Sequence, residues 1–405
     1  MSEATLTPKR DAQICALIGT GHFLSHFYML CLPPLFLVWR DEFHVSFAML
    51  GLAVALMSGT TALLQTPVGF LVDKHGARRF LVGGTLLMAL SISAMAFVHD
   101  YRLILLLAVL SGVGNSVIHP ADYAILAGSI RKEFIGRAFA LHTFTGNLGF
   151  ALAPPTIALL LLVMDWRDAL GLLGLLGVPV VGLILLQSRI LSDQPKARGP
   201  KPVAGSRLLT SKPILAFFAF FLLSAMAGSG MTAFLITVLG QLWGTSIAIA
   251  SMTLTGYMVG ATAGTLVGGW WADKKGGNLL GFVTVLTLIA MGLILSLGIV
   301  PYAEWLLPPV ALVAGLCLGS SRTPRDVMLK EACPPGEIGK VFGFVSAGLP
   351  LGSALMPVPL GLLIDFGLTW MVLPVVAILL GLSLLCAGGA KSMAMAQRPR
   401  MQPAE

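Results

Sequence analysis

The sequence has few charged residues for its length. Only 11% of its 405 residues are Asp, Glu, Lys or Arg, whereas 56% are hydrophobic and the mean hydropathy is +0.89. A soluble chain of this length would form two or three domains with charged surfaces. Here, uncharged apolar runs such as 80–98 and 279–300 have close to the ~20 residues that a membrane-spanning helix needs. The composition therefore excludes an ordinary soluble protein.

Motifs for redox, metal, nucleotide and hydrolytic chemistry are also missing. The five cysteines show no Cys-x-x-Cys spacing and lie mostly in apolar runs, so we expect buried thiols and no disulfides. The chain contains no Walker A loop and no evident nucleophile–base pair, so we expect neither direct ATP drive nor an enzyme, and no cofactor. The polar start, MSEATLTPKRDAQ, leads straight into an apolar run and therefore predicts no cleavable signal peptide.

Positive charges are sorted to one side of the apolar runs. Only three of the 26 Lys and Arg residues, Arg40, Arg102 and Arg167, fall in connections on the other side. Because positive loops are retained on the cytoplasmic face, both termini should be cytoplasmic and the protein should span an inner membrane. The net charge of +8 then reflects topology and anionic headgroups, and we expect no nucleic-acid partner. The predicted fold is an all-α integral membrane protein with twelve spans: 12–38, 47–72, 80–98, 103–129, 137–163, 168–188, 213–240, 247–272, 279–300, 306–331, 340–364 and 369–390.

The two halves of the sequence repeat each other in the same order. GFLVDKHG (69–76) returns as GGWWADKKG (268–276), HPAD (119–122) as TPRD (323–326), and GNLGFALAP (146–154) as GLPLGSALMP (348–357). Two parallel six-helix repeats are typical of secondary transporters. We therefore predict three parts: an N-terminal six-helix bundle over 1–188, a flexible basic cytoplasmic linker over 189–212, and a C-terminal six-helix bundle with a short tail over 213–405.

The repeated loop carries a resemblance to a known family. Gly69-Phe-Leu-Val-Asp73-Lys-His-Gly76-Ala-Arg78-Arg79 resembles the signature between helices 2 and 3 of the major facilitator superfamily, and 269–276 is its weaker copy. The resemblance covers essentially the whole chain. It implies that an aspartate and an arginine of this loop, with an acid at the end of helix 4, form a charge cluster that braces the outward-open state. The gating residues expected on this basis are Gly69, Asp73, Gly76, Arg78, Asp122, Arg131, Arg137, Asp273 and Asp326.

Two further stretches resemble subgroups of that superfamily. Gly112-x-Gly114-Asn115 with His119-Pro120 is similar to helix 4 of fosmidomycin-resistance-type exporters. Gly146-x-x-Gly149 with Pro154-Pro155 partly resembles helix 5 of drug–proton antiporters, although their helix 4 arginine is absent from 106–116. For Asp122 the alternative to gating is proton translocation.

Histidines are candidates for substrate binding or proton coupling. At ~1.5 Å per residue, His22 lies ~15 Å into span 1, near the midplane, and His26 follows on the same helix face. The resemblance implies that spans 1, 4, 7 and 10 line a central cavity, where imidazoles can exchange protons with water. Both side chains can instead merely hydrogen-bond between helices. A metal site is disfavoured, because no third ligand is evident at their depth.

Other polar residues are predicted nearer the cytoplasm. His119 and His142 can pair across the hairpin of spans 4 and 5, either as a gate or proton exit or in helix packing, and Asn115 belongs to the same helix 4 pattern. Arg322 is the one cation expected to reach the cavity, where it would attract a carboxylate or phosphonate. Its long side chain can alternatively snorkel to the cytoplasm.

The combined features predict a monomeric secondary active transporter that works by alternating access. The leading version is proton-coupled efflux of a small drug-like or metabolite molecule, with protons and the lipid bilayer as its other partners. One alternative is uptake or exchange of a small organic anion through Arg322. The other is a membrane sensor or partner-binding protein that kept the fold and does not transport.

Overall fold

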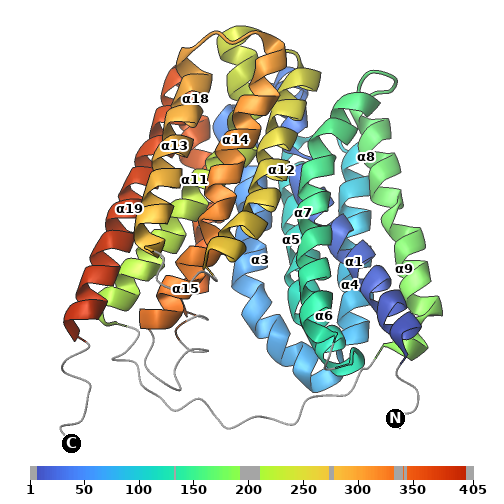
Figure 1. Cartoon of the computed structure of the whole chain (residues 1–405). Coiled ribbons are helices and arrows are strands. Elements are labelled where there is room, and N and C mark those ends of the chain that lie inside the picture. The colour runs from blue at the N-terminus through green and yellow to red at the C-terminus, as the bar shows by residue number, and fades with distance from the viewer. Residues whose placement is uncertain are drawn as a thin grey trace, which may run out of the picture. The chain divides into compact units, whose positions relative to one another are not determined.

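A computed structural model of the chain describes residues 7–131, 134–191, 210–272, 278–332, 341 and 344–397. Within these ranges the secondary structure consists of α-helices and short 3₁₀-helices (Figure 1). The chain divides into two compact units, Met1–Arg198 and Gly199–Glu405. Of the predicted linker 189–212, residues 192–209 lie outside the described ranges.

Unit 1 contains six helical passes, several of them in two pieces. These are α1 (Pro8–Leu30) with η2 (Pro33–Leu35) and α2 (Phe36–Phe43); α3 (Phe47–His75); α4 (Ala77–Ala94) with η3 (Met95–Phe97); α5 (Tyr101–Ser116) with α6 (Ile118–Ser129); α7 (Ile135–Leu160); and α8 (Trp166–Leu175) with α9 (Gly177–Leu186), followed by η4 (Ser188–Ile190).

Unit 2 contains six more passes. These are α11 (Lys212–Trp243); α12 (Ile247–Ala272); α13 (Leu279–Ile299); η5 (Glu304–Leu306) with α14 (Leu307–Ser320) and α15 (Arg322–Ala332); α17 (Gly348–Leu355) with α18 (Pro357–Asp365); and η6 (Thr369–Met371) with α19 (Val372–Gln397). α12 and α14 pack backbone to backbone, because a Cβ at Gly260 or Gly264 would overlap a carbonyl oxygen of α14.

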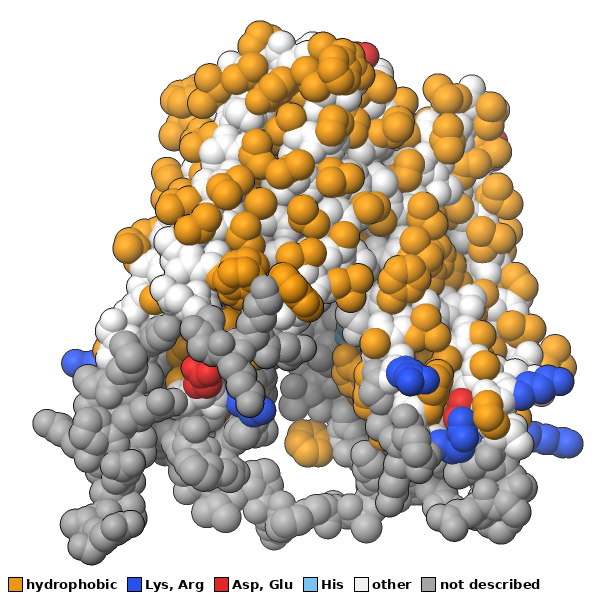
Figure 2. Space-filling model, in the orientation of Figure 1, with side chains coloured by type: hydrophobic (Ala, Val, Ile, Leu, Met, Phe, Trp, Pro, Cys, Tyr) orange, Lys and Arg blue, Asp and Glu red, His pale blue; other side chains and the backbone are white. Residues whose placement is uncertain are grey.

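Eleven helical segments among the described residues are long and apolar enough to cross a membrane. They correspond to every predicted span except the fifth. That pass, α7, is a 26-residue helix whose first half carries the polar residues His142, Thr143 and Asn147. Figure 2 shows hydrophobic side chains over the flanks of both units, and Leu186, for example, is 84% exposed. Apolar flanks of this extent fit contact with lipid.

Breaks in the fourth and tenth passes occur at corresponding places. α5 gives way to α6 at Val117, just before His119-Pro120, and α14 gives way to α15 at Ser321, just before Thr323-Pro324. Proline has no backbone N–H to donate to the preceding turn, which favours a helix break there. The break in unit 1 leaves His119 in the first turn of α6.

Candidate functional site: a buried histidine cluster

Four histidines from three helices gather at one place in unit 1. His22 and His26 lie on α1, His119 on α6 and His142 on α7. The ring of His22 stacks on that of His142 with 3.6 Å between centroids, and lies 4.3 Å from His26 and 5.0 Å from His119. These four residues are called the histidine cluster below.

Gly146 on α7 gives the cluster its space. α1 packs along α7, and a Cβ at Gly146 would overlap the ring of His22 and lie 2.8 Å from Nδ1 of His26. One turn further along, a Cβ at Gly149 would overlap the carbonyl oxygen of Phe23. Only glycine permits helices to approach so closely. The two glycines of the motif that resembles helix 5 of drug–proton antiporters therefore lie against α1, and Gly146 contacts the histidines.

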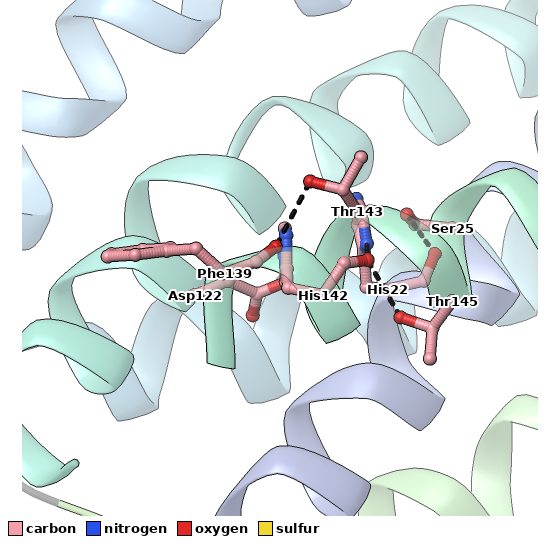
Figure 3. Close-up of polar contacts among 7 residues, drawn as sticks. All are labelled: His22, Ser25, Asp122, Phe139, His142, Thr143 and Thr145. Atoms are coloured by element: carbon pink, nitrogen blue, oxygen red, sulfur yellow. Dashed lines mark hydrogen bonds and ion pairs between the residues drawn. The ribbon is translucent and has the colours of Figure 1, made fainter. Parts of the chain in front are cut away.

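Asp122 joins the cluster through His142. The carboxyl group is fully buried, and its Oδ2 lies 2.9 Å from Nε2 of His142, which is 3% exposed (Figure 3). A buried carboxylate is costly unless it is paired and hydrogen-bonded. The imidazole of His142 is the group that pairs with it. Together the two side chains form a buried acid–imidazole pair that can hold a proton between an oxygen and a nitrogen.

The hydrogen bonds of His22 define which ring nitrogen carries the proton. Nδ1 of His22 lies 2.7 Å from the carbonyl oxygen of His142, which also accepts a hydrogen bond from the hydroxyl of Thr145 at 2.8 Å (Figure 3). A carbonyl oxygen can only accept, so Nδ1 of His22 must be the donor. In neutral His22, Nε2 therefore carries a free lone pair.

Several polar atoms in this region are buried without a hydrogen-bond partner. These are Nε2 of His22, Nδ1 of His26, Nδ1 of His119, Nδ1 of His142, Oδ1 of Asp122 and Nδ2 of Asn115, which is 2% exposed at the end of α5. Buried polar groups in native proteins nearly always have partners, so exceptions call for a functional explanation. His26 and His119 are only partly buried, so the cluster is not completely enclosed by protein. The arrangement offers several unpaired nitrogens and a carboxyl oxygen that can bind a proton or a polar ligand.

The predicted difference in depth between these histidines is wrong. Counting from span ends placed His22 near the midplane and His119 with His142 nearer the cytoplasm, but all four rings are in one group. The helices extend past the apolar runs, because α1 begins at Pro8 and α7 at Ile135. The expected shared face of His22 and His26 is confirmed. The expectation that no third metal ligand lies at their depth is wrong, because His119 is there.

The predicted charge cluster is arranged differently from the expectation. Asp122 was expected beside arginines, whereas the structure pairs it with His142 and pairs Arg131 with Asp11, whose carboxyl group is 1% exposed, at 2.6 Å. The reason is axial distance: Asp122 lies seven residues before the end of α6 at Ser129, ~10 Å at ~1.5 Å per residue, whereas Arg131 lies beyond that end.

Residues at the start of α1 and at the ends of α6 and η4 are joined by hydrogen bonds that were not predicted from the sequence. These contacts are called the brace below. Arg10 donates to the carbonyl oxygens of Ser129 at 3.2 Å and Ile190 at 2.8 Å, and Arg78 donates to that of Ser188 at 2.7 Å. The first turn of α1 is thereby tied to the ends of α6 and η4. The one available signal was Asp11, an acid within the basic segment that precedes the first apolar run.

The remaining predicted gating residues differ in how far the structure agrees with the expected role. Gly76 ends α3 with φ of 91°, the tight turn expected of it, whereas a Cβ at Gly69 would make only an ordinary 3.9 Å contact with Pro120. Arg137 is exposed, and Asp326 pairs with the neighbouring Arg325 at 3.1 Å. Asp273 and the side chain of Asp73 lie outside the described parts of the structure.

Arg322 lies in unit 2, at the start of α15. The residue is exposed over part of its surface, whereas its guanidinium is surrounded by protein and interacts electrostatically with the buried Tyr257 hydroxyl. Arg322 follows the break in the tenth pass, just as His119 follows the break in the fourth pass.

Comparisons with known proteins agree with this architecture. The family model described as Major Facilitator Superfamily matches residues 18–242 and 218–391. The fosmidomycin resistance protein of Escherichia coli is 26% identical over 376 residues, 89% of each chain. The multidrug resistance protein MdtH of Aeromonas hydrophila is 26% identical over 369 residues, 87% of this chain and 89% of that one.

A solved structure shares the fold. A bacterial homologue of the human lysosomal transporter Spinster, described as inward-facing and unoccupied, superposes with a TM-score of 0.81 at 13% identity, over 98% of this chain and 100% of that one. The duplicated six-pass units, the apolar flanks and the two family matches, which together cover most of the chain, lead to one assignment. The chain is a multi-pass membrane protein of the Major Facilitator Superfamily, a transporter and not an enzyme.

Proposed function

We propose that this protein exports a small drug-like or metabolite molecule across an inner membrane, in exchange for protons, by alternating access. Both termini would face the cytoplasm, as the loop charges predict. The observation that carries the proposal is the histidine cluster with Asp122: a buried set of proton-binding groups with unpartnered nitrogens, in a transporter that resembles resistance proteins over most of its length.

Export is supported by the relatives. Two proteins that align over at least 87% of this chain are named for resistance to fosmidomycin and to multiple drugs. Resistance follows when a membrane protein removes a compound from the cell. A sequence identity of about a quarter supports export as the shared activity, and it does not identify the exported compound.

Proton coupling is supported by the chemistry of the donor set. Imidazole nitrogens and one carboxylate bind protons readily, whereas Na⁺ is held by sets of oxygen ligands such as carbonyls. The sequence contains no nucleotide-binding loop for an alternative energy source. His22 is the proposed proton carrier; His26, His119 and His142 with Asn115 are proposed to bind substrate or relay protons.

Gating is proposed for the loop residues of the superfamily signature and their copies. Asp73 with Arg78 in unit 1, and the acids Asp273 and Asp326 with the neighbouring Arg325 in unit 2, would hold the cytoplasmic ends of the helices in one of two states. Arg131 and Arg137 would contribute charge there. The pairing of Arg131 with Asp11 suggests that α1 takes part in this gate.

A reconstituted transport assay tests the proposal. Purified protein in liposomes, given fosmidomycin, dyes or small organic anions, should accumulate at least one compound against its gradient when a pH difference is imposed. Nigericin, which exchanges K⁺ for H⁺ and removes that difference, should abolish accumulation. Accumulation driven by Na⁺ alone would contradict proton coupling.

The runner-up is exchange of a small organic anion at Arg322, favoured by the position of this cation at the break of the tenth pass. Arg322→Gln separates the two functions. It should leave transport of neutral dyes unchanged under the export proposal, and selectively abolish anion counterflow under the alternative. A folded protein that transports none of the compounds would favour the sensor alternative.

A further inference from the structure

The histidine cluster has more free nitrogen lone pairs than a proton site needs. Nε2 of His22 must be unprotonated in the neutral ring, because Nδ1 donates to the carbonyl of His142. Nδ1 of His119 is also buried without a partner. His26 presents its ring 4.3 Å from His22 and 5.7 Å from His119. Three imidazoles from α1 and α6 therefore lie close together.

The spacing of these nitrogens is close to that of a metal site. One ligand atom from each of His22, His26 and His119 can be chosen so that all lie within 4.8 Å of one another. A tetrahedral zinc ion with Zn–N bonds of ~2.0–2.1 Å needs ligand nitrogens ~3.3 Å apart. Small side-chain rotations can close the difference, since two of the rings are only partly buried.

The surroundings also match those of metal-binding histidines. Such residues usually donate their second ring N–H to a carbonyl or a carboxylate, which fixes the ring and its tautomer. His22 donates to a carbonyl oxygen in this way, at 2.7 Å. The neighbouring His142 pairs with Asp122, whose carboxyl group, when ionised, would offset part of the charge of a bound cation.

We propose that His22, His26 and His119 bind one divalent transition-metal ion of the zinc class. Imidazole ligands suit zinc, cobalt, nickel and copper, whereas Mg²⁺ and Ca²⁺ take oxygen ligands. Three protein ligands leave a fourth position open to water or to an anionic group, as in exchangeable rather than purely structural zinc sites. A bound metal would use the same Nε2 lone pair of His22 that the proton-carrier proposal uses, so the two proposals compete for this atom. They are tested separately, because metal binding is measured without transport, and the failure of one can be told from the failure of the other.

Cobalt provides a direct test, because tetrahedral Co²⁺ absorbs strongly in the visible range and octahedral aqueous Co²⁺ does not. The full-length protein is purified in detergent with a tag that contains no histidine. Three histidines outside the cluster, all exposed, are replaced together: His44→Asn, which tolerates the left-handed backbone of that residue, with His75→Gln and His99→Gln. This background protein should bind one equivalent of Co²⁺ with a tetrahedral spectrum that lacks the thiolate charge-transfer band of a cysteine ligand.

Substitutions in the background protein then identify the ligands. His119→Gln and His26→Gln remove partly exposed rings, and each should abolish the visible band while the protein still elutes as a single species with an unchanged melting temperature. Restoring His75 in the background protein is the matched control, because it returns an exposed imidazole that lies outside the cluster. The resulting protein should keep the band.

Two results would overturn the proposal: no tetrahedral spectrum from the folded background protein, or a spectrum that survives both ligand substitutions. If His119→Gln fails to fold, His26→Gln decides the question. Zn²⁺ should displace Co²⁺ and bleach the band, whereas Mg²⁺ should not.

Discussion

At the scale of single residues, the site depends on where protons and lone pairs lie. The carbonyl of His142 orients His22, and the carboxylate of Asp122 orients His142. Such chains of buried hydrogen bonds are rigid when complete, and costly when a member is left unpartnered. The unpartnered nitrogens are thus the residue-scale evidence for a ligand or a coupled proton.

Gly146 is predicted to be as important to the cluster as the histidines. In Gly146→Ala the new methyl group would overlap the His22 ring and press on Nδ1 of His26. Overpacking of this kind typically costs ~1–3 kcal/mol. We expect a lower melting temperature in detergent together with reduced transport.

Gly182→Ala is the matched control for that substitution. Gly182 lies within α9, and a Cβ there would meet nothing within 4 Å. Because alanine favours helix over glycine by ~1 kcal/mol, this variant should be at least as stable as the unmodified protein. Equal melting temperatures for both variants would show that the rings can move aside and that the cluster is loosely packed.

At the scale of helices, the passes could be predicted from the sequence because apolar length and proline positions act locally. The breaks before His119-Pro120 and Thr323-Pro324 agree with this effect, whereas Pro154 and Pro155 lie inside the continuous helix α7. The meeting of α1, α6 and α7 at one point could not be predicted, because it depends on how far each helix extends beyond its apolar run. The pairing of Asp11 with Arg131 escaped prediction for the same reason.

The brace at the start of α1 is predicted to stabilise unit 1. Asp11 is buried and Arg131 is 30% exposed at its side chain, so solvent screens the pair in part. We expect Asp11→Asn to lower stability by ~1–2 kcal/mol, less than the loss of a fully buried pair. Thermal unfolding in detergent measures this change.

A double-mutant cycle separates the ion pair from other effects. Once Arg131→Gln is present, Asp11→Asn should cost much less than it does alone, since the partner is already missing. Asp41→Asn, at an exposed position, is the neutral control. Additive losses from Asp11→Asn and Arg131→Gln would show that the contact contributes nothing to stability.

At the scale of the whole molecule, the family and the repeated six-pass units could be predicted from the duplicated motifs and the charge distribution. Orientation in the membrane follows from the same charges and is a separate prediction. Reporter fusions after residue 200 and at the C-terminus should be cytoplasmic, and a fusion near Asp165 should be periplasmic. A periplasmic signal after residue 200 would contradict six passes in unit 1.

The central claim, that the histidine cluster couples transport to protons, is tested most directly with His22→Gln. Glutamine retains hydrogen-bonding capacity in a side chain of similar length, but it cannot take up a proton near neutral pH. Downhill counterflow needs only binding and the conformational change, whereas accumulation driven by a pH gradient also needs the coupled proton. The account predicts that His22→Gln in proteoliposomes retains counterflow and loses pH-driven accumulation; full pH-driven accumulation by the mutant would contradict it.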